Sequence, residues 1–420
     1  MKCSEGKGFS LDLNKNICCG NSLIETEFCW QKAFPQVFKQ GGFDIVIGNP
    51  PYGVIDTNNK HKKVYEKNYK ALKSGRINIY QLFFGRATSL LSSKGILSFI
   101  HPKTLLTDFY LSATRKFLLK EFTSFTIANI VSRTDTFSSV IQAVVVSQWR
   151  KDTDDSCRLL EVKTKKDIEK REFLSLPKDE IISKRGIMLV SDKKEVYDII
   201  KKCNSVKTVS LNFVTGSTEW NKISDYLSGE KTEKSKRLIY AENIQRYTFA
   251  ESKKRVLTTY INSKAKVPTL SRPALFVQRT TATEQPYRII ATIIDPATFS
   301  VPIVSENHTN VFICNIPLVT ENNTNVYTCE NTETAFYILG ILNSRLMDFY
   351  FRLHNSNTHV SSRELNQLPL IDVAQKKRKP LVDLVTRRMK GELVDDKIDA
   401  LVYELYGLTE KEIALVEGGT

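Results

Sequence analysis

The sequence predicts an α/β fold: a partial doubly wound sheet of the Rossmann type, followed by a mostly β domain and C-terminal helices. Two observations carry this prediction. Residues 1–150 alternate short β-branched runs with segments of helical period. Residues 206–370 are rich in Thr, Val, Ile and Asn with prolines as breakers, which is typical of short strands and loops. The length of 420 residues indicates two or three domains, at roughly 100 to 200 residues per domain.

The first domain is expected over residues 1–150. Its clearest strand runs from Phe43 to Ile47 and ends at Gly48, as a buried parallel strand would. The other elements expected, in chain order, are a helix over 80–91, a turn over 92–95, a strand over 96–100, a helix over 111–122, and strands over 125–131 and 140–148. The sheet is predicted to be mainly parallel, with the last two strands able to pair antiparallel at an edge.

Three further segments follow the first domain. The charged composition of residues 151–205 indicates a connector, with a helical patch near 192–202. Residues 206–370 form the mostly β domain, which two helices interrupt over 333–353. Residues 371–420 are expected to be helical, because apolar side chains recur at helical spacing from Leu381 to Leu405.

Composition narrows the function. The chain carries 61 Lys and Arg against 46 Asp and Glu, a formal charge of +15, which suits a polyanionic partner such as nucleic acid. The basic residues gather in clusters over 60–76, 231–237 and 376–379. No apolar run reaches the roughly 18 to 20 residues of a membrane helix, and the N-terminus lacks a signal-peptide core, so a soluble cytoplasmic protein is expected.

Cysteine and histidine usage points away from metal and disulfide chemistry. The eight cysteines include no CxxC pair, and the five histidines show no ligand spacing. We therefore expect reduced thiols and no metal. Cys18 and Cys19 lie in an apolar run, where a small buried hydrophobe is the usual role of a free cysteine.

The segment that indicates chemistry is Asn49-Pro50-Pro51-Tyr52, directly after the first strand. The Asn49 side-chain carbonyl and the Pro50 backbone carbonyl can both accept hydrogen bonds from an exocyclic amino group, which turns its lone pair toward an electrophilic methyl group. The prolines lack N–H groups and stiffen the turn. Tyr52 offers an aromatic face for an extruded base. The alternative interpretation is a rigid exposed turn.

With these residues in view, the chain resembles the gamma-class DNA adenine methyltransferases of the TaqI type, including the methylase regions of type IIG restriction-modification enzymes. The resemblance extends over nearly the whole chain. Residues 43–53 are similar to the family's catalytic motif, and 94–102 to its next strand. Further similar segments are 115–119, 342–346, 365–370 and 398–409, the last three of which resemble the target-recognition domain and closing helices.

The resemblance implies roles for individual residues. Asn49, Pro50, Pro51 and Tyr52 take the catalytic positions. Phe137 takes the position of a second aromatic that closes over the flipped adenine, and its alternative interpretation is a core residue before a strand. Asn21 matches a residue that contacts the adenine moiety of S-adenosylmethionine, and its alternative interpretation is a simple turn asparagine.

One feature of the family is missing. A glycine-rich strand-to-helix turn for the cofactor's methionine end should precede the catalytic motif, yet only 48 residues stand before Asn49, and Gly6 and Gly8 precede no predicted helix. By analogy, residues 16–19 are strand three, and strands one and two are absent. The strand before Asn49 would then have an unpaired edge. We expect either the C-terminal part of a longer methylase or half of a split enzyme completed by an upstream polypeptide.

Sequence discrimination is expected within residues 206–370. Gln278 and Arg279 are residue types that pair with adenine and guanine edges, respectively. Four basic residues are expected to contact DNA phosphates and set orientation: Lys236, Arg237, Arg246 and Arg288.

The resemblance implies a site-specific DNA adenine methyltransferase of a restriction-modification system, which transfers a methyl group from S-adenosylmethionine to a flipped adenine. Its partner would be double-stranded DNA. Two alternatives stay open. One is a non-catalytic DNA-binding specificity subunit or truncated remnant, favoured by the missing glycine loop. The other is a protein glutamine or RNA guanine amino-methyltransferase, which would usually lack so large a basic domain.

Overall fold

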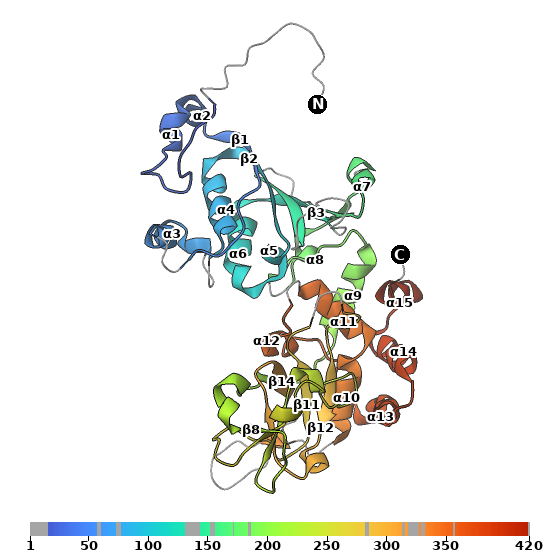
Figure 1. Ribbon diagram of the computed structural model, residues 1–420. Helices are drawn as coiled ribbons and strands as arrows, with labels where there is room; N and C mark the ends of the chain where they lie inside the picture. The colour runs from blue at the N-terminus through green and yellow to red at the C-terminus, as the bar shows by residue number, and fades with distance from the viewer. Residues whose placement is uncertain are drawn as a thin grey trace. The chain divides into compact units, whose positions relative to one another are not determined.

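The computed structural model divides the chain into two compact units, unit 1 (Met1–Asp192) and unit 2 (Lys193–Thr420) (Figure 1). It describes residues 16–56, 60–72, 77–130, 143–151, 156–170, 172–183, 186–281, 285–312, 316–317, 327–328, 332–355 and 358–418. No helix in these ranges is both long enough and apolar enough to span a bilayer.

Unit 1 is built on a six-stranded sheet of order β1-β2-β4-β3-β5-β6. Its strands are β1 (Phe43–Gly48), β2 (Leu91–Pro102), β3 (Ser124–Ile130), β4 (Val144–Arg150), β5 (Cys157–Val162) and β6 (Leu174–Leu176). β1 is parallel to β2, and β3 to β5, whereas β4 lies between β2 and β3 and is antiparallel to both. The α/β prediction is confirmed, and so is the antiparallel pairing of the last two predicted strands, which are β3 and β4. The expectation of a mainly parallel sheet with this pair at its edge is wrong, because β4 lies inside the sheet between β2 and β3.

Short helices surround this sheet. They are α1 (Trp30–Ala33), α2 (Pro35–Lys39), α3 (Lys62–Asn68), η2 (Lys70–Leu72), α4 (Ile79–Leu90), α5 (Thr104–Thr107), η3 (Phe109–Leu111), α6 (Ser112–Glu121), α7 (Lys165–Lys170) and α8 (Lys178–Ile181). Helix α4 packs against β1 and β2 (Figure 1). A capping box starts α4, in which the Asn78 backbone N–H donates to Gln81 Oε1 at 2.7 Å.

Two sequence predictions for unit 1 need correction. The predicted turn over 92–95 is the first part of β2, where the pairing with β1 shifts register between Phe43 and Ile45. The predicted connector over 151–205 is not a separate segment: β5 and β6 extend the sheet, and α9 (Lys194–Ser205) belongs to unit 2. Although the segment is charged overall, Cys157, Leu159 and Val162 are fully buried, and that burial determines its place.

Unit 2 contains two four-stranded sheets of order β13-β9-β10-β8 and β12-β11-β14-β7. Their strands are β7 (Phe213–Thr215), β8 (Leu227–Ser228), β9 (Lys236–Ile239), β10 (Tyr260–Ile261), β11 (Ala274–Gln278), β12 (Ala291–Ile294), β13 (Ile303–Ser305) and β14 (Thr309–Phe312). A separate pair is formed by β15 (Ile316–Pro317) and β16 (Tyr327–Thr328). The main sheets share an apolar core that includes Ile239, Phe276 and Ile303.

The remaining helices of unit 2 are α10 (Thr332–Leu342), α11 (Arg345–His354), α12 (Ser362–Leu365), α13 (Gln375–Met389), α14 (Asp395–Tyr406) and α15 (Glu410–Val416). Helix α13 packs against α10 and α14, and α15 packs against α9 (Figure 1). The close contact of α10 with α13 depends on Gly340, where a Cβ would lie 2.8 Å from the Val385 side chain. The two helices expected over 333–353 correspond to α10 and α11.

Candidate functional site

The Asn49–Tyr52 turn leaves the carboxyl end of β1. Gly48, the last residue of β1, passes close to Phe99 of β2: a Cβ there would lie 3.2 Å from the Phe99 ring. Asn49 is exposed, Pro50 is buried, and Gly53 ends the turn with φ +140°, a backbone conformation that L side chains rarely adopt. The end of the turn is attached to α4, because the Ile79 N–H at the start of that helix donates to the Gly53 carbonyl at 2.8 Å.

The turn keeps two hydrogen-bond acceptors available. Within the part of the chain that the structure describes, the Asn49 side chain makes no hydrogen bond, and no loop or cap backbone N–H donates to the Pro50 carbonyl. Both oxygens are therefore free to accept from a ligand. An amino group with two N–H donors has the complementary pattern.

Tyr52 is 37% exposed and lies at the end of a series of three rings from α4 and β2. Its ring centroid lies 6.2 Å from that of Tyr80 on α4, at an interplanar angle of 81°. Tyr80 in turn stacks on His101 of β2 at 6.4 Å and 16°, and His101 meets Phe84 edge-on at 5.3 Å. Tyr52 thus makes an edge-to-face contact with a buried ring while the residue stays accessible to a partner.

A buried hydrogen-bond chain fixes His101. Its Nδ1 lies 3.0 Å from the Pro102 carbonyl and its Nε2 lies 2.8 Å from Ser147 Oγ. Since a carbonyl can only accept, Nδ1 carries the proton, and Nε2 accepts from Ser147, which itself accepts from Trp149 Nε1 at 2.8 Å. Burial lowers the pKa of His101 to about 4, so the ring beneath Tyr80 is neutral near pH 7.

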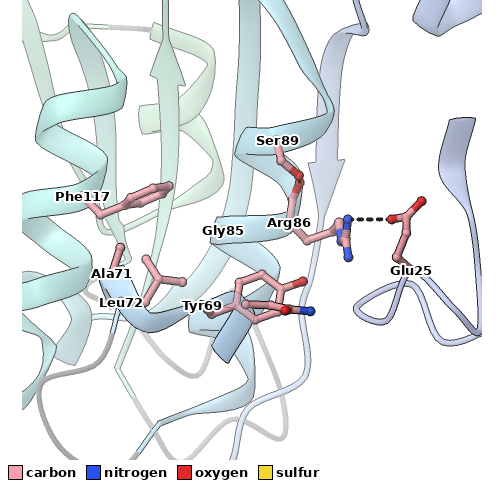
Figure 2. A pocket seen from close by; sticks show the side chains of 9 residues that line it. Glu25, Tyr69, Ala71, Leu72, Gly85, Arg86, Ser89 and Phe117 are labelled. Atoms are coloured by element: carbon pink, nitrogen blue, oxygen red, sulfur yellow. Dashed lines mark hydrogen bonds and ion pairs between the residues drawn. The ribbon is translucent and has the colours of Figure 1, made fainter. Parts of the chain in front are cut away.

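The loop that contains Asn21 is attached to α4 through Arg86. Asn21 Oδ1 accepts from the Leu23 N–H at 3.3 Å, which is the local bond of an Asx turn. Arg86 of α4 holds the loop: its Nη2 donates to the Leu23 carbonyl at 3.0 Å, and its Nη1 pairs with Glu25 at 3.1 Å (Figure 2). The turn interpretation of Asn21 thus has direct support, and its contact with a cofactor stays a prediction.

A cavity of about 400 Å³ lies beside this loop. Figure 2 shows Tyr69, Leu72 and Phe117 on its apolar side, with the Arg86–Glu25 ion pair at its rim. None of the residues of the Asn49–Tyr52 turn lines it. The cavity is therefore separate from the acceptors described above.

The predicted third strand is absent, but the predicted free edge is present. Residues 17–19 form no strand, and Cys18 and Cys19 are exposed rather than buried. Among the described strands β1 pairs only with β2, and Ile45 and Ile47 on one of its faces are 60% and 79% exposed. Such side chains are normally covered on both faces of a parallel sheet.

The structure corrects two of the recognition residues. Arg237 is buried among Phe249, Tyr260 and Phe299, with its guanidinium carbon 5.4 to 5.6 Å from each ring centroid. Arg288 is buried as well, and its Nε donates to Thr281 Oγ1 at 2.9 Å. Both side chains are buried and would have to leave these partners to contact a DNA phosphate.

Each of the other four predicted recognition residues makes at least one contact within the protein. Arg246 pairs with Asp395 at 3.2 Å and lies 3.7 Å over the Tyr287 ring. Three side chains donate to backbone carbonyls: Lys236 to Ala265 at 2.6 Å, Gln278 to Ile244 at 2.6 Å, and Arg279 to Asn307 at 2.9 Å. Phe137, the remaining predicted base-stacking residue, lies outside the described residues.

Sequence reasoning missed Tyr80, His101 and Arg86. Each of them contacts a residue that is distant in the sequence. The local sequence around Tyr80 does not distinguish a ring that contacts Tyr52 from any other aromatic residue of a helix. Among the described residues no cluster of three His, Cys, Asp or Glu side chains could hold a metal ion.

Two protein-family models match the chain. Residues 5–137 match the Eco57I restriction-modification methylase model, and residues 300–370 match the TaqI-like C-terminal specificity domain. The resemblance to restriction-modification methylases inferred from the motifs is thereby confirmed.

Sequence relatives extend the similarity beyond these two regions, although the chain spans less than two thirds of the length of the first two. The chain is 24% identical to the type II methyltransferase M.BsuBI of Bacillus subtilis, covering 78% of this chain and 64% of that protein. It is 25% identical to a putative type II restriction enzyme and methyltransferase of Methanocaldococcus jannaschii, covering 90% of this chain but 32% of that protein. M.PstI of Providencia stuartii is 24% identical, with 90% and 74% covered.

The fold also has a solved counterpart. The type IIL restriction-modification enzyme MmeI, determined in complex with DNA, superimposes with a TM-score of 0.52 at 11% identity, covering 93% of this chain and 56% of that one. The likeness shows a shared fold.

Proposed function

We propose that this chain, which is similar to restriction-modification methyltransferases over most of its length, is the catalytic and recognition part of a site-specific DNA adenine methyltransferase. The observation that carries the proposal is the Asn49–Tyr52 turn. It presents two unused acceptors, Asn49 Oδ1 and the Pro50 carbonyl, beside an aromatic ring that is partly exposed and contacts the buried Tyr80 ring.

The chain's own residues orient the acceptor nitrogen. An adenine extruded from the duplex would stack on Tyr52 and donate its two amino hydrogens to Asn49 and Pro50. These bonds draw the nitrogen lone pair out of conjugation with the ring and hold it in one direction. The backing by Tyr80 and the neutral His101 keeps Tyr52 in position without placing a charge beneath the base. S-adenosylmethionine would supply the electrophilic methyl group.

The described residues form only part of a cofactor site. The Asn21 loop and Asn49 could form one side of it, but the face of β1 that carries Ile45 and Ile47 has no covering layer. We therefore propose that a further polypeptide segment, encoded upstream, adds strands to the free edge of β1 and supplies a glycine-rich loop. Unpaired strand edges with apolar side chains favour such pairing.

Unit 2 is proposed to discriminate the DNA sequence, since the TaqI-like specificity match lies within it. The recognition surface must use residues other than the buried Arg237 and Arg288. Partial side-chain exposure leaves Lys236, Gln278 and Arg279 as candidates, each of which would have to exchange an internal hydrogen bond for one to DNA.

A methyl-transfer assay tests the proposal. The chain, alone and together with the product of the reading frame immediately upstream, is incubated with radiolabelled S-adenosylmethionine and mixed-sequence DNA, and the labelled nucleoside is identified after digestion. We expect label on the adenine amino group only when both polypeptides are present. Label with the chain alone would refute the incomplete cofactor site.

The same assay addresses the alternatives. Absence of label in DNA with either preparation, together with retained DNA binding, would favour the non-catalytic specificity subunit, a reading that the uncovered face of β1 also supports. Label appearing in glutamine of a protein substrate or guanine of RNA, but never in DNA, would favour the other amino-methyltransferases.

A further inference from the structure

Two neighbouring aromatic side chains, Phe109 and Tyr110, protrude from unit 1. They are 48% and 63% exposed, and their ring centroids lie 5.8 Å apart at 73°. Other aromatic residues nearby, such as Tyr80, Phe84 and Phe99, are buried. Two adjacent exposed rings offer apolar faces on which a planar group can stack.

The pair lies at the same end of the sheet as the Asn49–Tyr52 turn. β1 and β2 are parallel, so their carboxyl ends lie at the same edge; β1 ends at the turn, while β2 leads through α5 into η3, which carries the pair. Tyr80 connects the two places: its ring contacts Tyr52, while Thr104 and Asp108 of the η3 approach lie near enough to influence its hydroxyl.

A buried arginine holds the segment in place. Arg115 is 1% exposed and donates to the carbonyls of Leu105 at 2.9 Å, Asp108 at 2.6 Å and Gly186 at 2.6 Å. The Asp108 carboxylate also accepts from the Tyr110 N–H at 2.8 Å. Burying a guanidinium is expensive unless its donors are satisfied, so these bonds fix the backbone beneath the rings. The rings are exposed on a rigid base.

A basic segment of unit 1 connects to the helix that follows the pair. Thr114, four residues after Tyr110, donates through Oγ1 to the Leu72 carbonyl at 3.1 Å, which places η2 beside α6, and α3 packs against η2. This segment carries exposed lysines at Lys60, Lys63, Lys67 and Lys70. Lysines that follow a phosphate backbone, combined with aromatic rings, are the pattern of proteins that bind unstacked nucleic acid.

We propose that Phe109 and Tyr110 stack on a nucleobase of the DNA that has lost its pairing or stacking partner when the target base leaves the helix. The inference rests on the proposed function for its substrate class. It assigns the pair a binding role distinct from that of Tyr52, which faces the target base itself. Stacking would stabilise the opened DNA and so favour the extruded state.

The test compares three DNA probes labelled for fluorescence anisotropy: a single strand of mixed sequence, the same strand with abasic sites at its central positions, and the duplex. The proteins are the wild type, the Phe109→Ala/Tyr110→Ala double variant and Tyr226→Ala, which removes an exposed aromatic residue from unit 2. Stacking on one base contributes about 1–3 kcal/mol, equivalent to roughly 5- to 150-fold in affinity.

We expect the double variant to bind the base-containing single strand roughly 5- to 150-fold more weakly and the abasic strand less than twofold more weakly, with Tyr226→Ala unchanged on both. Equal losses on both strands, or no loss on either, would overturn the proposal. A Phe109→Trp variant adds a direct signal: its emission should be quenched by the base-containing strand and not by the abasic strand. An unchanged emission would also overturn it.

The readout is separate from catalysis. If base-dependent binding is lost in the double variant while the wild type methylates no DNA, the stacking role stands and the proposed enzyme activity does not. If the wild type methylates DNA and the double variant binds both strands normally, the proposed enzyme activity stands and the stacking role does not.

Discussion

At the scale of single residues, the proposed chemistry depends on Asn49. Because its side chain is exposed and makes no hydrogen bond to the described residues, Asn49→Ala should leave folding intact and remove one oriented acceptor from the substrate amine. Loss of one such transition-state contact typically costs roughly 10²- to 10³-fold in rate. We expect that loss in methyl transfer by the completed enzyme, with DNA affinity changed less than threefold, measured against Asn68→Ala, an exposed asparagine on α3. Equal effects of both substitutions would refute the catalytic role.

His101 gives a prediction about pH. Its folded-state pKa of about 4 lies below the ordinary 6.5 because the ring is buried, so between these values the unfolded chain binds a proton that the folded chain does not. The stabilisation from neutral His101 is complete above pH 6.5 and declines as pH falls toward 4. At pH 5 the loss is about 2 kcal/mol.

Urea unfolding at pH 7.5 and 5.0 measures this contribution. We expect His101→Phe to lose less stability than the wild type between the two pH values, and His359→Phe, which removes an exposed histidine, to behave like the wild type. If His101→Phe lost as much unfolding free energy between pH 7.5 and 5.0 as the wild type, another group would be responsible for the pH dependence.

The sequence carries more information about the proposed catalytic residues than about the proposed DNA contacts. Asn49, Pro50 and Tyr52 could be proposed from the sequence because the chemistry expected of them depends on residue type and on one adjacent strand. The burial of Arg237 could not be predicted because a positive charge indicates nothing about burial: the three rings around it come from separate segments. Its side chain is stabilised by ring contacts that only the tertiary structure brings together.

At the scale of elements, the free edge of β1 makes a prediction of its own. Replacing Ile45 and Ile47 together by Glu should leave the isolated chain folded, since both side chains are exposed, and should reduce its self-association. The same change should prevent an upstream polypeptide from adding to β1. Light scattering after size exclusion and methyl transfer in the mixed preparation measure the two effects.

Ile168→Glu is the matched control, because Ile168 is an exposed isoleucine on α7, away from β1 in the sheet order. It should affect neither measurement. If the Ile45/Ile47 double variant still supports full activity with the upstream product, then β1 does not receive the added strands.

Local pattern predicted most helices and strands of unit 1, and it was wrong where tertiary pairing decides. The β-branched runs at β1 and β3 were sufficient to predict these strands, and the apolar period was sufficient to predict α4. The strands β5 and β6 were not predictable, because charged neighbours mask the buried Cys157, Leu159 and Val162. Likewise, no local signal in the sequence places β4 between β2 and β3, because strand order depends on pairing between segments that are distant in the sequence.

At the scale of the whole molecule, the formal charge of +15 bears on how DNA is held. Each phosphate neutralised by a lysine contributes about 0.9 to the slope of log affinity against log salt concentration for duplex DNA. A lysine that attracts DNA only at long range, without contacting a phosphate, does not add this fixed amount to the slope. The slope therefore separates direct phosphate contacts from general attraction, whatever the recognised sequence is.

Two triple variants with equal charge change exploit this difference. One replaces the α3–η2 lysines by Gln, and the other does the same on α13; the positions are Lys63, Lys67 and Lys70, and Lys376, Lys377 and Lys379, all of them exposed. If the lysines beside Phe109 and Tyr110 contact the backbone, the first variant should lower the salt slope for mixed-sequence duplex by roughly 2 to 3, and the second by less than 1. Equal reductions would show that net charge alone is at work, and a reduction confined to the α13 variant would move the phosphate contacts to unit 2.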